Sequence, residues 1–420
     1  MRQLIYLAAC SAWNRRLTLG MTLLAIALSV TLLLGVERIR NDARESFAQA
    51  VSGTDLIVGA RTGPVQLMLY TVYRIGDASN NIGWQSFEAI AALPGVAWAV
   101  PLSLGDSHRG FAVLGTTPAY FERFRHGAGS ALAFSGGERF NDLFDAVIGG
   151  DVARQLGYKI GDRIVLSHGA GEVSLAEHAD KPFVVSGILA ATGTPVDRTV
   201  HVSLEALQAI HLDWQGGMPV PGLSIPAQYV RKFDLRPKAI TGALLGLDNR
   251  AEVFRIQRLV NDYPKEPLLA VLPGVALDQL WQAIGFAEKS LMAVSAMVVV
   301  VGLCGLVAVM LAGINERRRE LAILRSVGAS PGKIFSLLTI EGLGVTFAGA
   351  LLGVVLLGVL GVVLEPLLRS SFGLVLHTHT ISTSEMQLIG LVVAAGFLVS
   401  LVPGYRAYKL SLADGLTPNV

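Results

Sequence analysis

The sequence predicts a membrane protein with four transmembrane α-helices and a large α+β extracytoplasmic domain inserted between the first and second helices. Three observations predict this architecture. Hydrophobic residues make up 52% of the 420 residues and charged residues only 16%, whereas about 25% of the residues of soluble domains are charged. The apolar excess lies in four runs, and most charged residues lie in one segment between the first two. Basic residues gather on one side of these runs.

The composition argues against several other classes of protein. The chain is apolar and without a short repeat, and it has two cysteines and a net charge of +2. Disordered chains, collagens, disulfide scaffolds and nucleic-acid binders all differ from this pattern. We therefore expect no nucleic-acid partner.

The four apolar runs are each long enough to cross a bilayer. Residues 17–36, 290–314 and 386–405 contain no charged residue, and residues 334–364 contain only Glu341. About 20 apolar residues are needed to cross a hydrocarbon core of about 30 Å as a helix. Arg15 and Arg16 precede the first run, as in a cleaved signal peptide. The run is longer than the apolar region of such a peptide and lacks a small-residue cleavage site, which favours a retained anchor.

The distribution of basic residues predicts the orientation. By the positive-inside rule, residues 1–16 (with an interfacial helix over Leu4–Trp13), 315–333 and 406–420 are cytoplasmic. The segments 37–289 and 365–385 are then periplasmic, in a bacterial inner (plasma) membrane, and 365–385 contains a single basic residue, Arg369. The basic residues on the predicted cytoplasmic side are Arg2, Arg15, Arg16, Arg317, Arg318, Arg319, Arg325, Lys333, Arg406 and Lys409.

Residues 37–289 are predicted to form a domain with its own hydrophobic core. This segment holds 49 of the 66 charged residues and neither cysteine, so no disulfide braces it. Periodicity divides it into a mixed α/β piece (about 40–140 plus about 225–289) and a β-rich piece (about 141–215) inserted into the first. Strands are expected at 55–60, 96–104, 111–115, 163–166, 183–189, 199–202, 238–247 and 268–272, and helices at 84–92, 151–156, 204–210, 250–262 and 275–289.

A short charged helix is expected between the second and third spans. Residues 315–333 combine charged residues with apolar residues at near-helical spacing, Leu321, Ile323 and Leu324. Gly328 is a suitable end for the helix, and Ser330 with Pro331 suits the start of the next one. Such a helix either lies on anionic lipid headgroups or docks into a soluble partner.

The segment ERRRELAILRSVGASPGKI resembles the motif between the second and third spans of FtsX-like permeases, the group that includes MacB and LolC/LolE. VIGGDVARQLGYKIGDRIVL, FVVSGIL and TPVDRTVHVSLEAL resemble the MacB-type periplasmic core. The layout of one span, a large domain and three more spans is also similar. The resemblance implies an ABC transporter permease that acts as a dimer and transmits motion from an ATPase. The residues it implies for ATPase coupling are Glu316, Arg317, Arg318, Arg319, Glu320, Leu321, Leu324, Arg325, Gly328, Ala329, Ser330 and Lys333.

No enzymatic activity is expected from this chain. Gly332-Lys333 lacks the spacing and the following Ser or Thr of a phosphate-binding loop, and no nucleophile, base and orienting group can be assembled from the sequence. Only about 16 residues precede the first run, so we expect a separate ATPase subunit that carries the ATP and Mg²⁺. The other expected partners are a second permease copy, identical or different, a periplasmic fusion or substrate-binding protein, and membrane lipid.

Two features of the third run point to contacts inside the membrane. Glu341 is its only charged residue, and we interpret it as a carboxylate that bonds a neighbouring helix or reaches the interface, with coupling to the partner as the alternative. Gly349 and Gly353 form a G-x-x-x-G motif that favours close helix packing. The motif alone does not tell packing within the chain from packing across a dimer.

The histidines of the insertion are interpreted as solvated loop residues. His168, His178, His201 and His211 lie near Glu172, Glu177 and Asp180, but their spacing matches no standard zinc pattern. We therefore expect no metal site.

The function expected from the sequence is coupling of ATP hydrolysis to export, or to periplasmic handling, of a hydrophobic, lipid-linked, peptide or toxic substrate. The alternative is an FtsX-like scaffold that transports nothing and passes the ATPase cycle to a periplasmic hydrolase or sensor.

Overall fold

A computed structural model describes residues 16–76, 78, 80–169, 176–215, 218–220, 225–316, 318–372 and 381–409. The predicted interfacial helix over Leu4–Trp13 and most of the C-terminal tail lie outside these ranges. The chain divides into two compact units. The helical unit comprises Met1–Asp42, Gly285–Pro366 and Leu376–Val420, and the α/β unit comprises Ala43–Ile284 and Leu367–Val375.

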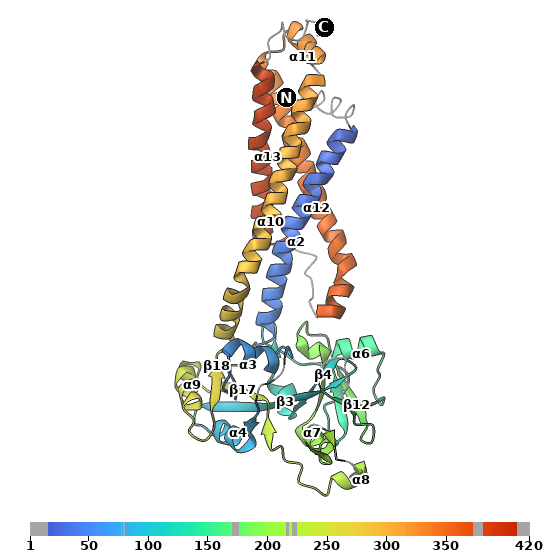
Figure 1. The fold of residues 1–420 in the computed structure, drawn as a ribbon, viewed down its shortest axis with the longest axis vertical. Helices are drawn as coiled ribbons and strands as arrows, with labels where there is room; N and C mark the ends of the chain where they lie inside the picture. Colours follow the sequence, from blue (N-terminus) through green and yellow to red (C-terminus); the bar gives the residue numbers. More distant parts are fainter. Residues whose placement is uncertain are drawn as a thin grey trace. The chain divides into compact units, whose positions relative to one another are not determined.

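Four long helices form the helical unit (Figure 1). They are α2 (Arg16–Gln49), α10 (Pro273–Glu316), α12 (Pro331–Phe372) and α13 (Thr383–Lys409), and each is long and apolar enough to cross a membrane. Each contains one of the predicted spans and continues beyond it. The short helix α11 (Arg318–Ser326) connects α10 to α12.

Glycines of α12 bring its backbone close to α2. A Cβ atom at Gly349 would lie 2.8 Å from Ile26 Cγ2, and one at Gly353 would lie 2.7 Å from the Ala27 carbonyl oxygen. The Thr31 hydroxyl donates a hydrogen bond to the Gly353 carbonyl at 3.0 Å. The G-x-x-x-G motif thus packs within the chain, against the first span.

The other helix pairs also meet at small residues. A Cβ atom at Gly342 of α12 would lie 2.6 Å from Ser400 Cβ of α13, and one at Gly302 of α10 would lie 3.1 Å from Ser29 Oγ of α2. Ser29 also donates to the Val298 carbonyl at 3.3 Å. Helices α2 and α12 run in the same direction, and α10 and α13 run in the opposite direction (Figure 1). Small residues are the usual means of bringing apolar helices together where lipid removes the hydrophobic driving force.

A buried ion pair joins α2 to α13. Arg38 donates to both carboxylate oxygens of Glu385, at 2.7 and 3.1 Å, and their side chains are only 11% and 3% exposed. Glu385 also accepts from the Ser382 backbone N–H, while the Ser382 hydroxyl accepts from the Glu385 N–H. This reciprocal capping box fixes the start of α13. It also holds the Glu385 carboxylate in the position where it accepts the hydrogen bonds from Arg38.

The α/β unit is built on a 12-stranded sheet with the main order β18-β1-β17-β3-β4-β13-β8-β12-β7. Strand β3 belongs to both halves of this sheet, because its first part pairs with β17 and its last part with β4. The strands of the main order are β1 (Leu56–Ala60), β3 (Val96–His108), β4 (Phe111–Thr116), β7 (Phe134–Gly137), β8 (Asp145–Ile148), β12 (Phe183–Leu189), β13 (Thr199–Ser203), β17 (Gly242–Leu247) and β18 (Leu268–Val271). The short strands are β2 (Ile82–Gly83), β5 (Arg125–His126), β6 (Ser130–Ala131), β9 (Arg163–Ile164), β10 (Ser167–His168), β11 (Ala176–Glu177), β14 (Trp214–Gln215), β15 (Met218–Pro219) and β16 (Ala239–Ile240).

Side chains alternate between the two faces of the sheet, as the period of a strand requires. In β1, Ile57 packs on one face while Leu56 and Val58 pack on the other. In β4, Leu114 and Val113 divide in the same way. Because both faces are covered, strand β1, which lies between β18 and β17, is buried along its whole length. The helices of this unit are α3 (Pro64–Thr71), α4 (Trp84–Ala91), α5 (Ala119–Arg123), α6 (Gly150–Leu156), α7 (Leu204–Ile210), α8 (Ala227–Val230), α9 (Val253–Asn261), and the 3₁₀ turns Pro195–Arg198 and Arg250–Glu252.

The division between the two pieces of the insertion lies inside a strand. We predicted a strand over 96–104 and a boundary near residue 141. The strand instead runs to His108, with a register shift between Leu104 and Asp106 and a φ of 149° at Gly105. Strand β4, predicted within the first piece, therefore pairs with β13 of the second. A bulge redirects a strand without ending it, so turn residues in the sequence do not mark this boundary.

Candidate functional site

Helix α11 has one side buried in the helical unit and another exposed. Leu321 and Ala322 are 7% and 5% exposed, and Leu321 packs in the core of the helical unit. Ile323, and Val327 in the turn directly after α11, are 54% and 83% exposed, and the Val327 N–H donates to the Ile323 carbonyl at 3.1 Å. Leu321, which the resemblance implied for coupling, thus holds the helix in place, whereas Val327 was not among the predicted coupling residues.

The end of α11 forms as its sequence predicts. Gly328 has a φ of 97°, a conformation that glycine adopts at little cost. The N–H of Gly328 donates to the Arg325 carbonyl and the N–H of Ala329 to the Leu324 carbonyl, both at 3.0 Å. This closure satisfies carbonyls at the end of the helix, and α12 begins at Pro331 after Ser330.

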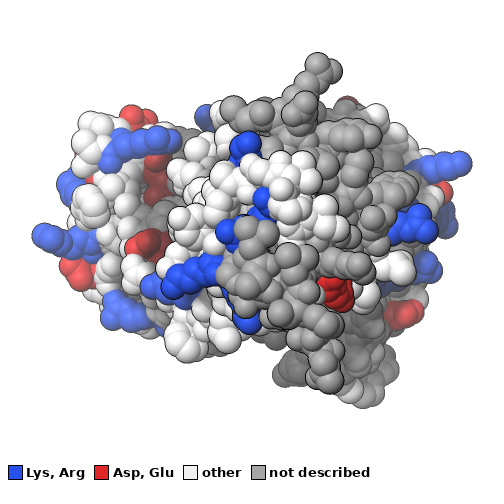
Figure 2. All heavy atoms as spheres, turned by 90° about the horizontal axis from the view of Figure 1, so that it is seen from above, with Lys and Arg blue, Asp and Glu red and all other residues white. Residues whose placement is uncertain are grey.

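Basic side chains surround this end of the helical unit. Lys333, Arg406 and Lys409 are exposed and Arg325 is partly buried, and basic side chains lie among uncharged ones in the view along the helices (Figure 2). Lys409 Nζ lies 4.8 Å from the centre of the Tyr405 ring. Among the other predicted coupling residues, Glu316 is exposed. Arg317 and the side chains of Arg318, Arg319 and Glu320 lie outside the described part of the chain.

Glu341 lies inside the helical unit rather than on its surface. Its residue exposure is 7%, one position before Gly342, which packs against α13. A carboxylate at this place is positioned to contact the neighbouring helices of its own chain.

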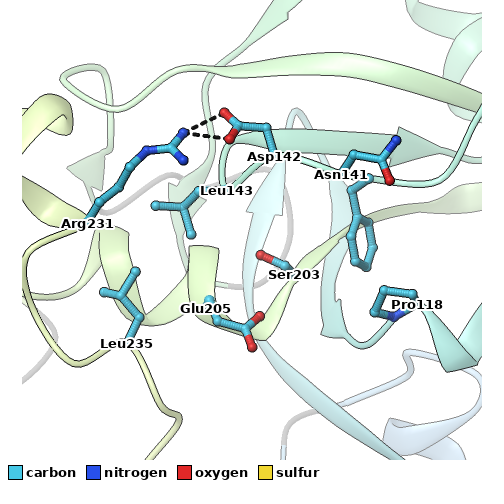
Figure 3. A pocket seen from close by; sticks show the side chains of 9 residues that line it. Pro118, Asn141, Asp142, Leu143, Ser203, Glu205, Arg231 and Leu235 are labelled. Carbon is cyan, nitrogen blue, oxygen red and sulfur yellow. Dashed lines mark hydrogen bonds and ion pairs between the residues drawn. The ribbon is translucent and has the colours of Figure 1, made fainter.

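A cavity of about 480 Å³ opens in the α/β unit (Figure 3). Arg231 donates to both oxygens of Asp142, at 2.6 and 2.7 Å, and this contact lowers the pKa of Asp142. Both side chains are more than half exposed, so the pair contributes little to stability. The cavity is lined by Pro118, Phe140, Asn141, Asp142, Leu143, Ser203, Glu205, Arg231 and Leu235. Its apolar and polar lining suits an amphiphilic ligand.

Three histidines and one aspartate meet elsewhere in the α/β unit. Asp106 lies near the end of β3, His168 is its partner across the ladder in β10, His178 follows β11, and His211 caps the end of α7. One ring nitrogen or carboxylate oxygen from each lies within 4.8 Å of the others. We call these four residues the Asp-His cluster.

The electrostatics of the Asp-His cluster are strongly coupled. Burial opposes ionisation of Asp106, but hydrogen bonds from His168 and His211 outweigh burial and lower the pKa of Asp106 to about 2. Burial, reinforced by the nearby His211, lowers the pKa of His178 to about 4. For His211, burial is outweighed by the Asp106 carboxylate, and the pKa is raised.

The prediction that these histidines are solvated loop residues was wrong. His178 and His201 are fully buried, and the side chains of His168 and His211 are only 27% and 25% exposed. His201 lies apart from the Asp-His cluster, with its ring 5.4 Å from that of Tyr120. Of the acidic residues considered with them, Glu177 pairs with Ser167 in the β10–β11 ladder and Asp180 contacts Lys181. Glu172 lies outside the described residues.

The sequence did not reveal the Asp-His cluster because its members come from four separate elements. Asp106 is 62 residues from His168 and lies beyond the predicted end of its strand, so no local pattern links the two residues. The alternation of a longer β3 would have shown on which face of the sheet Asp106 lies. The pairing of β3 with β10 then brings the two residues together.

Two protein families match separate parts of this chain. Residues 19–227 match the MacB-like periplasmic core domain, and residues 292–412 match the FtsX-like permease C-terminal domain. Together they include most of the chain, three of the four long helices in full or nearly so, and much of the α/β unit.

Similar curated proteins belong to lipoprotein-releasing systems. The transmembrane protein LolC of Haemophilus influenzae is 24% identical, and the match covers 66% of each chain. LolE of the same organism is 23% identical, over 69% of this chain and 68% of LolE. The chain thus spans about two thirds of the length of these relatives. The periplasmic region of MacB from Actinobacillus actinomycetemcomitans is 10% identical, covering 57% of this chain and 97% of that one, with a TM-score of 0.33, too low to establish a common fold.

Proposed function

Because this chain belongs to the FtsX-like permeases of ABC transporters that carry a MacB-like periplasmic core domain, we propose that α11 couples it to a separate ATPase subunit. In this proposal, ATP and Mg²⁺ are bound and turned over by the partner. The permease itself is a multi-pass inner-membrane protein, with both termini and α11 in the cytoplasm.

The observation that carries the proposal is the exposed apolar face of α11. Ile323 in the helix and Val327 in the turn directly after it are exposed, while the other side of the helix is fixed by Leu321 and Ala322. Large apolar side chains on a rigid, partly basic helix are suited to a pocket on a protein partner, where buried anchors supply most of the binding energy. A helix that only lay on lipid headgroups would need no such rigid base.

The transmission of motion is proposed to use α2 and α10. Each is one continuous helix that runs from a predicted span into residues of the α/β unit. At its α/β end, α2 contributes Phe47, which stacks on Tyr73 at 4.4 Å and contacts Trp281 of α10 at 5.6 Å. Ala276 and Leu277 of α10 are part of the same hydrophobic core. A displacement of either helix would therefore act on a packed core, which transmits strain.

The proposed substrate class is hydrophobic or lipid-linked. The names of LolC and LolE refer to lipoprotein release, and the cavity beside Arg231 and Asp142 has both apolar and polar lining. The second candidate remains a scaffold that passes the ATPase cycle to a periplasmic hydrolase or sensor. Purification of the detergent-solubilised complex with identification of its bound proteins and lipids separates them, because a bound hydrolase without lipid or lipoprotein favours the scaffold.

The coupling proposal is tested by Ile323→Asp and Val327→Asp. Each places a charge in the proposed interface, and we expect ATPase binding to weaken at least about 30-fold, since an interface hot spot contributes about 2 kcal/mol or more. Binding is measured by co-purification of the ATPase and by the ATPase rate of the reconstituted complex.

Ile160→Asp is the matched control, because Ile160 is 50% exposed in the α/β unit, outside the proposed interface, and its substitution makes the same chemical change as Ile323→Asp. We expect this variant to retain the ATPase. If the ATPase co-purified with Ile323→Asp and with Val327→Asp as well as it does with the wild-type permease, α11 would be rejected as the docking element.

A further inference from the structure

We propose that Asp106, His168, His178 and His211 form a structural zinc site in the α/β unit. This inference is independent of the proposed transport function, because none of the four residues takes part in it. The argument rests on the donor set, the spacing of the donor atoms, an unpartnered buried histidine and the surroundings of the ligands.

The donor set is one that zinc prefers. Three imidazoles and one carboxylate are all common ligands of Zn²⁺, and structural zinc sites use four protein ligands in a tetrahedron. The set contains no thiolate, so it remains usable in an oxidising compartment. One carboxylate beside a divalent ion leaves a net charge of +1, which a partly buried site tolerates better than +2.

The donor atoms are already spaced close to the edges of a tetrahedron. Bonds of about 2.0–2.1 Å to zinc place neighbouring donors about 3.3 Å apart. Asp106 Oδ1 lies 3.0 Å from His168 Nδ1 and 3.4 Å from His211 Nε2, and these two nitrogens are 3.2 Å apart. His178 Nε2 is 4.0 Å from Asp106 Oδ1, and all four donor atoms lie within 4.8 Å of one another. A movement of His178 by about an ångström would bring its donor atom to the spacing of a tetrahedral site.

Fully buried His178 has no hydrogen-bond partner among the residues that the structure describes. Neither of its ring nitrogens is bonded within the described structure, and its ring packs 4.3 Å from Trp214. An unsatisfied buried polar group destabilises the folded state, and native proteins rarely leave one. Coordination of a metal by Nε2, which faces Asp106, would give this nitrogen a partner.

The tautomer of His211 is set by its other nitrogen. His211 Nδ1 donates to the Leu207 carbonyl at 2.8 Å, so loss of the Nε2 proton leaves a lone pair directed at His168 and Asp106. A second hydrogen bond of this kind commonly orients metal-ligating histidines and makes them better donors. Without a metal, a proton on Nε2 lies between His211 and the Asp106 carboxylate, 3.4 Å apart; zinc would take the place of this proton, and both groups would bind the ion.

The surroundings shield the site yet leave a route to it. Trp214 lies within 5.5 Å of all three histidine rings and gives the site an apolar wall. A cavity of about 150 Å³ reaches Asp106, His168 and His211 from outside. The nearby ammonium of Lys181 is neutralised by Asp213 at 3.0 Å and Asp180 at 2.7 Å, so it does not leave an uncompensated charge against the metal.

The role that fits the site is structural. Its ligands come from β3, β10, the segment after β11 and the end of α7, and one ion would tie these elements together. The insertion has no cysteine, so no disulfide provides such a link. All four positions would be filled by protein, and a closed set of this kind stabilises a fold rather than activating water.

The test measures zinc on the full-length chain, purified in detergent without a polyhistidine tag and stripped with a chelator. After addition of Zn²⁺ and removal of free metal, we expect one zinc per chain by elemental analysis. We also expect Zn²⁺, but not Mg²⁺, to raise the unfolding temperature, because a ligand that binds only the folded state stabilises it. Co²⁺ in place of Zn²⁺ should give the visible absorption of a tetrahedral site.

His168→Gln and His211→Gln, both at partly exposed ligands, are expected to weaken zinc binding at least tenfold and to abolish the rise in unfolding temperature. His201→Gln is the control, since His201 is buried in the same unit but outside the cluster, and it should bind zinc normally. Asp106→Asn provides a further ligand variant of nearly unchanged shape if a histidine variant fails to fold. A stripped wild-type chain that takes up no zinc, or ligand variants that bind it like the wild type, would overturn the proposal.

Discussion

At the scale of the residue, side chains that look alike in the sequence have different roles in the structure. Leu321 and Ile323 both belong to the apolar pattern of α11, but one is buried in the helical unit and the other is exposed. His168 and His201 both lie in the α/β unit, but only His168 is near a carboxylate. Which neighbours a side chain meets decides its chemistry, and this depends on elements distant in the sequence.

His201 is expected to make the α/β unit sensitive to acid. Burial, with a smaller contribution from the charge of Arg74, lowers the pKa of His201 to about 3, while an unfolded histidine titrates near 6.5. Below about pH 6.5 His201 binds a proton in the unfolded state but not in the folded state. The free energy of unfolding therefore falls as the pH drops from about 6.5 towards 3. One such group contributes a slope of at most about 1.4 kcal/mol per pH unit.

The prediction is checked by thermal unfolding between pH 7.5 and 4 in the presence of a chelator. His201→Gln, which retains an N–H donor for the Val147 carbonyl, should lose stability less steeply than the wild type. Identical slopes would show that His201 does not control the acid response.

At the scale of the element, helices meet where the sequence provides small residues. The G-x-x-x-G motif of α12 packs on α2, and single glycines and serines join the other pairs. The apolar runs alone specify four helices but not which faces meet. The buried pair of Arg38 and Glu385 adds a polar contact that fixes α13 against α2, and this pairing was not predicted, because the two residues lie 347 positions apart.

Gly353→Leu is expected to destabilise the helical unit. A Cβ atom at this position would lie 2.7 Å from the Ala27 carbonyl and 2.9 Å from Val30 Cβ, so the two helices would have to separate. Overpacking of this kind costs about 1–3 kcal/mol, and the variant should unfold at a lower temperature in detergent.

Gly358→Leu provides the comparison on the same helix, since a Cβ atom there meets nothing within 4 Å. It should unfold close to the wild-type temperature. Equal losses for the two variants would indicate that helix propensity or lipid contact, rather than packing on α2, accounts for the effect.

At the scale of the whole molecule, the chain combines four helices long enough to span a membrane with one α/β unit between the first and the second. The β-rich half is inserted into the other half, whose strands β1 and β3 come from before the insertion and β17 and β18 from after it. The family match agrees with a multi-pass inner-membrane permease, while the orientation of the chain stays a prediction from its basic residues.

Single cysteines test that orientation. In a chain without Cys10 and Cys304, Ser130→Cys in the α/β unit and Ser330→Cys before α12 both provide exposed thiols. We expect a membrane-impermeant maleimide to label position 130 in cells with a permeabilised outer membrane, and position 330 only after lysis. Labelling of both from the same side would refute the topology.

The order of the spans, the short helix α11 with its glycine end and most strands of the α/β unit were predictable, because they depend on local rules. Apolar length, the 3.6-residue period and the φ of Gly328 act within a few residues. The extension of β3 through Asp106, the burial of Leu321 and the partner of Arg38 were not predictable, because each depends on a contact between distant segments.

The sequence by itself determined that this protein spans a membrane, carries a large domain between its first two spans and belongs with FtsX-like permeases. Apolar runs and short motifs are enough for these conclusions, because the cost of placing charge in lipid acts on each segment separately. Only the tertiary structure decided that the G-x-x-x-G motif packs within the chain, that Ile323 of α11 and Val327 directly after it are exposed, and that Asp106 meets three histidines. Strand pairing and helix packing bring together residues that no local pattern links.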